Sequence, residues 1–350
     1  MAYVMKKAFF GCERLKGPDR RDCSLSVSLF SVHTALAKCF SRRLFKNRQQ
    51  RTDTASTACT VGCVYLRARC SPYGMSLVMD YSITPREFEQ FRALIYEECG
   101  ISLNESKQTL LVSRLSKRLR TLELDSFQAY YDLVAGRTES DEFTLLLDLV
   151  STNKTDFFRE PKHFDFLREQ ILPTLQSTRR IRIWSSASSS GEEPYTIAMT
   201  LHDSVPDPDQ WDFKILASDI STRVLARAAS GVYEDERVRK LPRDTVKRHF
   251  LKGKGDHAGM IKVKPHLTQM VCYRRINLMD DAFPIKAPLD LIFCRNVMIY
   301  FDRPTQAQLV AKFYRYLKPG GYLFIGHSES LQRLDQPFKA VAPTIYQKKA

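Results

Sequence analysis

Apolar residues recur every three or four positions between residues 84 and 149, which is the spacing of amphipathic helices. This spacing predicts four helices, at residues 85–99, 106–122, 127–134 and 140–149. The first has the clearest start signal, because Thr84 can cap it, Pro85 suits its first position and Glu87 lies three residues beyond the cap. We therefore predict an all-helical domain of roughly 75 residues, placed at residues 79–155.

Short apolar runs alternate with helical segments from residue 156 to residue 350. Strands are predicted at residues 181–184, 213–219, 289–296 and 322–326, and helices at residues 192–199, 222–229 and 306–317. This order predicts an α/β fold with a mostly parallel sheet. The alternation breaks between residues 248 and 275, where strand patterns at 260–264 and 270–273 predict a small antiparallel β-subdomain inserted at about 250–275.

A turn of small residues joins the first predicted strand to the next helix, from Ser185 to Gly191. Small side chains let a ligand approach the backbone, and the carboxyl end of a parallel strand is where nucleotide-like ligands bind. Glu193, just after the turn, suits the positive end of the helix dipole. The turn lacks the G-x-G-x-x-G pattern of dinucleotide sites, so an ordinary strand-to-helix turn is the alternative.

Polar residues also follow the second and third predicted strands. Asp219 closes the second strand at about the spacing of the acid that binds ribose hydroxyls in doubly wound folds. Its alternative role is to cap the helix that follows. Arg295, Asn296 and Tyr300 come at the end of the third strand, so we expect them over the same crevice.

The second predicted helix has a leucine-rich side and a basic side. The basic positions are Arg114, Lys117, Arg118 and Arg120. This face predicts a docking surface for an acidic partner, and the alternative is an ordinary solvated face.

A polar junction at residues 152–160 links the helical domain to the sheet. Its Asn and Thr side chains can bond a ligand. The alternative is a linker that is held by a buried aromatic clasp of Phe157 and Phe158.

Charge and cysteine are concentrated at the start of the chain. Residues 1–78 carry 14 Lys and Arg against four Asp and Glu, which gives +10 of the total net charge of +15. This leader lacks sustained periodicity, so we expect disorder or weak helix. A further hypothesis is that the native protein starts at Met75 or Met79.

Only Cys59 and Cys63 are closely spaced and no second close pair or matching His pair accompanies them, so no metal site is predicted. Without a secretory signal or a long apolar run, a cytoplasmic location is expected.

Seven motifs, in order, resemble the CheR family, the chemoreceptor glutamate methyltransferases that use S-adenosylmethionine. The motifs are T-N-x-T-x-F-F-R-E at the junction, W-S-x-A-S-x-S-G-E-E-P-Y, A-S-D-I, Asn277-Leu278, F-C-R-N-V-M-I-Y-F-D, L-K-P-G-G and G-H-S-E. The resemblance runs from residue 83 to residue 346 and has no counterpart for the leader. It implies a Rossmann-like methyltransferase domain at residues 156–350, preceded by a helical receptor-recognition domain.

The resemblance also implies roles for individual residues. The positions that match the family's cofactor contacts are Asn153, Thr155, Arg159, Glu193, Asp219, Asn277, Leu278, Arg295 and Asn296. Arg159 and Tyr300 match the groups nearest the transferred methyl. The chain departs from the family at Lys154, where an acidic or apolar residue is common, and at Ser186-Ala187-Ser188, where an Ala-Gly-Cys type of turn is more frequent.

The implied reaction needs no general base, because a glutamate carboxylate has a pKa of about 4.3 and is ionised at neutral pH. Arg159 can hold one carboxylate oxygen, or it can instead form a structural pair with Glu160 or Asp156. The resemblance implies S-adenosylhomocysteine as product and a monomer that meets the membrane only through receptors. The basic helix would bind acidic receptor helices, and the β-subdomain a receptor's C-terminal peptide.

Two other functions are consistent with parts of the sequence. A nucleic-acid methyltransferase is suggested by the basic composition and by the Asn296 to Tyr300 segment, although the extra residue in that spacing and the location of the charge in the leader argue against nucleic acid. A non-catalytic regulator that keeps the fold and binds the cofactor or a receptor is the third hypothesis.

Overall fold

The computed structural model describes residues 65–71, 74–136, 140–151, 153–286, 288–332, 334 and 336–349. The leader up to residue 64, with Cys59 and Cys63, lies outside the described residues. Strands β1 (Tyr65–Ser71) and β2 (Gly74–Asp80) form an antiparallel pair, with Tyr65 opposite Asp80 and Ser71 opposite Gly74. The structure thus has a strand pair where the sequence pattern favoured disorder or weak helix, and the native start at Met75 or Met79 stays a prediction.

The helical domain contains the four predicted helices. They are α2 (Pro85–Cys99), α3 (Gln108–Thr121), α4 (Phe127–Val134) and α5 (Asp141–Val150), with a 3₁₀ turn, η1 (Glu105–Lys107), before α3. Thr84 and Glu87 form the predicted capping box, in which the Glu87 carboxylate accepts from the Thr84 N–H at 2.7 Å. Gly100 ends α2 at φ 70°, in the left-handed region. Phe91 packs against the aromatic rings of α4 at the centre of the bundle.

The second domain is built on a seven-stranded sheet. Its strands are β3 (Arg180–Ser185), β4 (Asp212–Asp219), β8 (Val271–Arg275), β9 (Leu289–Cys294), β10 (Leu317–Ile325), β11 (Phe338–Ala342) and β12 (Ile345–Lys348), in the order β11-β12-β10-β9-β3-β4-β8. The five strands from β10 to β8 are parallel, and β11 and β12 add an antiparallel edge. This arrangement confirms the predicted α/β fold with a mostly parallel sheet. The strand order reverses between β3 and β9, so the crevice there is the expected ligand site.

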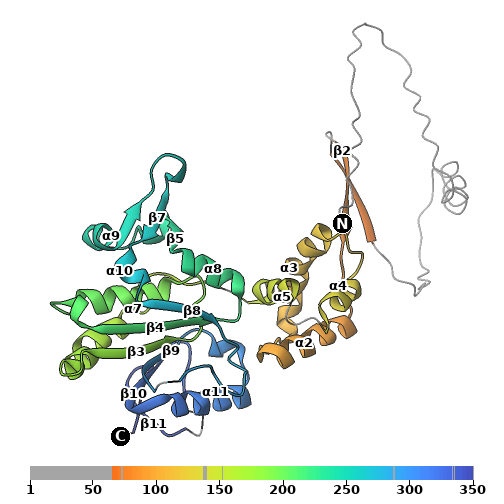
Figure 1. Ribbon diagram of the computed structural model, residues 1–350. Coiled ribbons are helices and arrows are strands. Elements are labelled where there is room, and N and C mark those ends of the chain that lie inside the picture. Colours follow the sequence, from red (N-terminus) through yellow and green to blue (C-terminus); the bar gives the residue numbers. More distant parts are fainter. Residues whose placement is uncertain are drawn as a thin grey trace, which may run out of the picture. The chain divides into compact units, whose positions relative to one another are not determined.

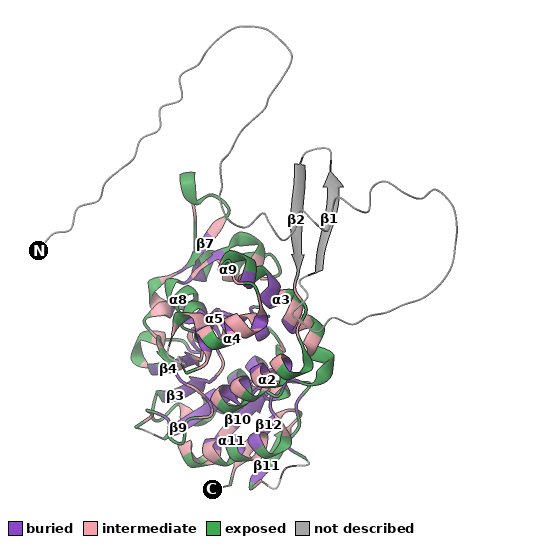
Figure 2. Cartoon of the chain, turned by 90° about the vertical axis from the view of Figure 1, so that its right-hand side faces the viewer, coloured by how far each residue is buried: buried purple, intermediate pink, exposed green. Residues whose placement is uncertain are grey.

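Helices cover both faces of this sheet (Figure 1). The helical segments of this domain outside the β-subdomain are α6 (Lys162–Phe166), η2 (Leu167–Ile171), η3 (Leu172–Leu175), α7 (Glu192–Asp203), η4 (Pro208–Gln210), α8 (Thr222–Ser230), η7 (Met298–Tyr300) and α11 (Arg303–Tyr316). All six residues of β9 are buried, and they alternate between the faces: Leu291 and Phe293 pack with α7, whereas Ile292 and Cys294 pack with α11. The central strands are accordingly mostly purple in Figure 2.

The β-subdomain is a three-stranded antiparallel sheet with a composition that differs from the prediction. Its strands are β5 (Val232–Glu234), β6 (Phe250–Lys252) and β7 (Met260–Val263), accompanied by η5 (Asp235–Val238), α9 (Arg243–His249), η6 (Gly255–His257) and α10 (Pro265–Thr268). The prediction that residues 270–273 belong to it is wrong. Residues 271–273 instead start β8, which pairs in parallel with β4 at the edge of the main sheet. A short strand pattern does not specify its partner, so the sequence could not distinguish the two sheets.

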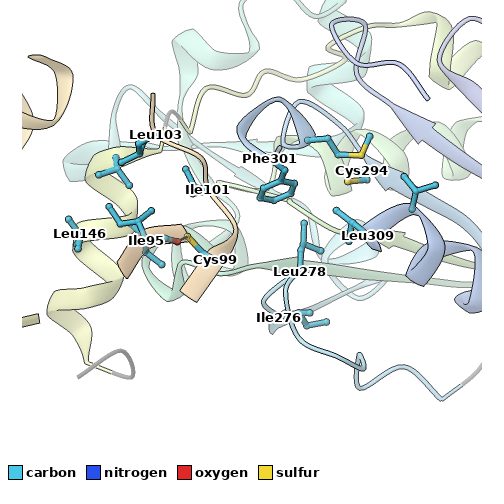
Figure 3. Packing of buried hydrophobic residues seen from close by; sticks show 14 of the residues in the cluster. Ile95, Cys99, Ile101, Leu103, Leu146, Ile276, Leu278, Cys294, Phe301 and Leu309 are labelled. Atoms are coloured by element: carbon cyan, nitrogen blue, oxygen red, sulfur yellow. Dashed lines mark hydrogen bonds between the residues drawn. The ribbon is translucent and has the colours of Figure 1, made fainter. Parts of the chain in front are cut away.

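The helical domain contacts the sheet domain through one continuous apolar cluster. Ile101 forms an isolated antiparallel bridge with Phe301, and Figure 3 shows Cys99 and Ile101 near Phe301 and Leu278. A polar contact also joins the two domains. The Asp148 carboxylate accepts from Arg223 on α8 at 2.8 Å.

Candidate active site

A cleft of about 950 Å³, counting the solvent at its mouth, lies over the carboxyl ends of the strands. Every residue that the sequence predicted for cofactor binding or methyl transfer lines it: Asn153, Thr155, Arg159, Glu193, Asp219, Asn277, Leu278, Arg295, Asn296 and Tyr300. The structure therefore brings together residues from five separate motifs, although their individual roles stay predictions.

The serine-rich turn after β3 forms the floor of the cleft. Its backbone is tied to both neighbouring strands, because the Ser186 N–H donates to the Phe293 carbonyl at 2.9 Å and the Ser188 N–H donates to the Ser218 carbonyl at 2.8 Å. Gly191 ends the turn at φ 97°, where a Cβ would lie 2.7 Å from the Tyr233 hydroxyl. The turn therefore requires glycine at this position for both backbone conformation and packing.

Arg295 is fixed between two carboxylates at the end of β9. Its side chain is 2% exposed and contacts Glu160 at 3.0 Å and Glu193 at 3.1 Å. Burial raises the pKa of Glu193. Burial alone would also raise the pKa of Glu160, but Arg295 and the hydrogen bonds from the His327 N–H and the Asn296 amide outweigh it and lower that pKa. The guanidinium is thus a rigid part of the cleft wall, because its hydrogen bonds are already made inside the protein.

Asp219 faces the cleft from the end of β4. One oxygen accepts from the Ser189 N–H at 2.9 Å and the other from the Ser221 N–H at 3.1 Å. Burial raises the pKa of Asp219 to about 6, partly offset by these hydrogen bonds. The helix α8 is capped by Ser221, whose hydroxyl accepts from the Val224 N–H. The capping alternative for Asp219 is therefore wrong, and its carboxylate is available to a ligand.

Arg159 is exposed at the rim of the cleft, and its guanidinium donates to the Lys154 carbonyl at 2.9 Å. The alternative pairs for Arg159 are taken by other residues, since Glu160 pairs with Arg295 and Asp156 with Arg237. The guanidinium is therefore held by a neutral carbonyl, which an anionic ligand can replace.

The junction that carries Arg159 is anchored by aromatic packing. Phe157 is buried against the rings of Tyr233 and Phe250, and the Phe158 N–H donates to the Thr196 hydroxyl at 3.1 Å. The predicted aromatic clasp is thus found at Phe157, which is buried, whereas Phe158 is only partly buried, and both residues belong to a segment that lines the cleft.

Left-handed backbone conformations are concentrated around this cleft. Phe158, Glu160, Ser189 and Asn296 all have positive φ, between 47° and 59°. Each such non-glycine residue costs about 1–3 kcal/mol and persists only where its surroundings enforce it. Phe158 and Glu160 flank Arg159, so this strained segment fixes where the Arg159 side chain starts.

Asn277 and Tyr300 connect the cleft to the helical domain. The Asn277 amide donates to the Glu98 carbonyl of α2 at 2.6 Å, and its oxygen accepts from the Met279 N–H. The carbonyl of Tyr300 accepts from the Ser102 N–H at 2.8 Å. The helical domain therefore helps to shape the cleft, which sequence patterns did not indicate.

The predicted basic face of α3 divides into two kinds of residue. Arg114 donates to the Leu149 and Ser151 carbonyls, and Arg118 donates to both oxygens of Glu142. The Arg118 hydrogen bond lowers the pKa of Glu142. Lys117 and Arg120 are exposed. Two of the four cations therefore hold the bundle together, and the docking prediction concerns chiefly the other two.

Glu329, the last residue of the G-H-S-E motif, does not line the cleft but bonds to a residue that does, and the sequence pattern gave it no role of its own. Its buried carboxylate accepts from the Asn296 N–H at 3.1 Å and from the Gly326 N–H. It thereby holds the left-handed turn of Asn296 after β9. An acid inside a glycine-containing motif after a strand was the available signal.

A family model described as CheR methyltransferase, SAM binding domain, matches residues 153–347. A second model, described as CheR methyltransferase, all-alpha domain, matches residues 86–151. The chain belongs to the CheR methyltransferase family. The resemblance found in the motifs is thus confirmed, together with the methyltransferase fold, the helical domain and the antiparallel subdomain.

Curated relatives agree over most of their length. The chain is 44% identical to "Chemotaxis protein methyltransferase 2" of Pseudomonas aeruginosa, covering 76% of this chain and 94% of that protein. It is 39% identical to "Chemotaxis protein methyltransferase" of Escherichia coli, covering 76% and 91%. It is 42% identical to the protein of the same name from Borreliella burgdorferi, covering 77% and 96%.

As a CheR methyltransferase, the protein is an enzyme whose cofactor is S-adenosylmethionine. The cleft fits that molecule, because a short-side-chain turn, an acid without a cationic partner at Asp219, and the buried Arg295 with its two carboxylates line one space. Across the described part of the chain, every helix is too short or too polar to cross a membrane.

Proposed function

We propose that the protein transfers the methyl group of S-adenosylmethionine to glutamate side chains of membrane chemoreceptors during chemotactic adaptation. The products are glutamyl methyl esters and S-adenosylhomocysteine. The observation that carries the proposal is Arg159, an exposed guanidinium at the rim of the cleft, which donates to the neutral Lys154 carbonyl at 2.9 Å. The names of the chemotaxis relatives support the same pathway.

The reaction is an in-line displacement. A carboxylate oxygen forms a bond to the methyl carbon as the carbon–sulfur bond breaks, and the bonding pair stays on sulfur. The acceptor is ionised at neutral pH, so the protein has no proton to remove. Alignment of the two reactants and exclusion of water are then the main contributions, and alignment can supply roughly 7–11 kcal/mol.

The residues of the cleft have distinct proposed tasks. The Asp219 carboxylate accepts hydrogen bonds from the ribose hydroxyls, which its raised pKa of about 6 still allows at neutral pH because it is then mostly ionised. Arg159 holds the non-attacking oxygen of the glutamate, and Tyr300 lies with it nearest the transferred methyl. Asn153, Thr155, Glu193, Asn277, Leu278, Arg295 and Asn296 complete the cofactor contacts.

Receptor recognition is proposed at two surfaces. Lys117 and Arg120 of α3 attract the acidic cytoplasmic helices of the receptor. The β-subdomain has edge strands at β5 and β6, and an extended C-terminal receptor peptide can add to such an edge. We place the enzyme in the cytoplasm as a monomer that reaches the membrane through its receptors.

The test is to offer S-adenosylmethionine with a radiolabelled methyl group to receptor-bearing membranes and, separately, to RNA. We expect label on a membrane protein, released as methanol by base, since carboxyl methyl esters hydrolyse readily. Label on RNA would favour the nucleic-acid methyltransferase instead. Cofactor binding without label on either would favour the non-catalytic regulator.

A further inference from the structure

Three histidines that are far apart in sequence meet at the base of the β-subdomain. His202 lies in the last turn of α7, His249 is the last residue of α9, and His266 lies in α10. One ring nitrogen of each lies within 4.8 Å of one ring nitrogen of the other two. None of the three lines the cofactor cleft.

Asp203 orients two of these imidazoles. The Nε2 of His249 is 3.0 Å from both Asp203 oxygens, and the Nδ1 of His202 is 3.2 Å from one of them. A carboxylate is only an acceptor, so each of these nitrogens carries the proton and the other nitrogen of each neutral ring carries the lone pair. Metal-ligating histidines are commonly held by a carboxylate in this way.

His266 carries the third imidazole and donates from its Nε2 to the Nδ1 of His249 in the metal-free protein, so a metal ion that binds both nitrogens displaces that proton. The Nδ1 of His249 lies 3.1 Å from the Nε2 of His266, and the His249 side chain is fully buried. Ligands of a tetrahedral zinc ion with bonds of 2.0–2.1 Å are roughly 3.4 Å apart. The pair is therefore close to the required spacing, and one ring nitrogen of His202 already lies within 4.8 Å of a ring nitrogen of each of the other two.

We propose that His202, His249 and His266 bind one divalent transition-metal ion of the zinc class. Imidazole nitrogens suit zinc, copper and nickel, and Asp203 supplies the outer-shell carboxylate. The charge on Asp203 is partly balanced by Arg248, which contacts it at 2.9 Å and is itself half exposed. The site would link two parts of the molecule. His249 and His266 belong to α9 and α10, which are joined directly to strands β6 and β7 of the β-subdomain, whereas His202 belongs to α7, which starts at the cleft. A bound ion fastens the subdomain to that helix.

The experiment titrates the full-length protein with zinc by calorimetry after its accessible thiols have been alkylated, so that cysteine does not compete. We expect one equivalent of tight binding and a higher Tm with zinc, since a ligand of the folded state stabilises it. Cobalt should give the intense visible absorption of a tetrahedral site, without a thiolate charge-transfer band.

Two variants and a matched control decide the assignment. His202→Gln and His266→Gln leave the buried His249 in place, so both should fold, and each should lose at least the roughly 10–100-fold affinity that an outer-shell change costs. His257→Gln alters an exposed histidine in the β-subdomain and should bind zinc normally. The proposal is overturned if the wild type shows no saturable one-to-one binding, or if His202→Gln and His266→Gln bind as the control does.

Discussion

Replacement of Asp219 by Asn or Ala tests how the cleft holds its cofactor. Hydrogen bonds to a charged group contribute about 1.5–3 kcal/mol, so loss of the carboxylate's bond to the ribose should weaken binding of S-adenosylhomocysteine roughly 10- to 150-fold. Asn keeps one acceptor oxygen for the Ser189 or Ser221 N–H, and is therefore the gentler change. Asp209→Asn, in the exposed η4 turn, is the matched control.

The pKa of Asp219 adds a second signature. In the cofactor-free protein that pKa is raised to about 6 by burial. If Asp219 binds the ribose as proposed, its ionised form is the better acceptor, so affinity is present above pH 6 and falls as pH decreases through it. At pH 5 roughly a tenth of the molecules have an ionised Asp219, so the apparent Kd should be about tenfold higher than at pH 7.

Calorimetric titration with S-adenosylhomocysteine at pH 5, 6 and 7 measures both effects. The wild type and Asp209→Asn should share the tenfold dependence on pH, whereas Asp219→Asn should bind weakly at every pH with a flatter profile. Equal affinity of Asp219→Ala and the wild type at pH 7 would refute the ribose assignment. An unchanged pH profile in Asp219→Asn would show that a different group titrates.

Arg159→Ala should lower turnover by about 100-fold or more, the scale of a misaligned reactant, while calorimetry still detects cofactor binding; normal turnover would exclude Arg159 from the reaction. Lys117→Glu with Arg120→Glu should raise KM for receptor and flatten its salt dependence at unchanged Tm, and an unaltered KM would indicate a merely solvated face. Arg118→Ala should instead lower the free energy of unfolding by about 1.5–3 kcal/mol in a denaturant titration, since it removes the hydrogen bonds to Glu142. Gly191→Ala should cost about 1–3 kcal/mol in the same assay, and a neutral result would contradict the packing against Tyr233.

The sheet and the cleft were predictable because they depend on local patterns. Buried parallel strands are continuous apolar runs, and polar residues just beyond them meet at one edge whatever the loops between them do. Asp219 and Arg295 were placed correctly in the cleft for this reason. The β-subdomain was predicted less well, because β5 is only three residues long and β8 is too short to reveal its partner.

Contacts between distant side chains were the part that the sequence could not provide. Arg114 and Arg118 looked alike on a helical wheel, yet both donate to residues of α5 or its end rather than to solvent. The histidine cluster was not predicted for the same reason, because His202, His249 and His266 do not have the sequence spacing of a metal-binding motif. Such contacts depend on how elements pack, and periodicity carries no information about it.

Glu160 holds the residues around Arg159 in place in the ligand-free protein, so the side chain proposed to align the acceptor is positioned before a ligand binds. Its carboxylate accepts from the Arg295 guanidinium at 3.0 Å, from the Asn296 amide at 3.2 Å and from the His327 N–H at 3.2 Å. One side chain thus fastens the junction segment to the ends of both β9 and β10. Arg159 is its immediate neighbour in the chain, so the guanidinium proposed to hold the acceptor is positioned by the same contacts that position the cofactor pocket. A mutation of Glu160 should therefore disturb turnover and cofactor affinity together, whereas Arg159→Ala should separate them.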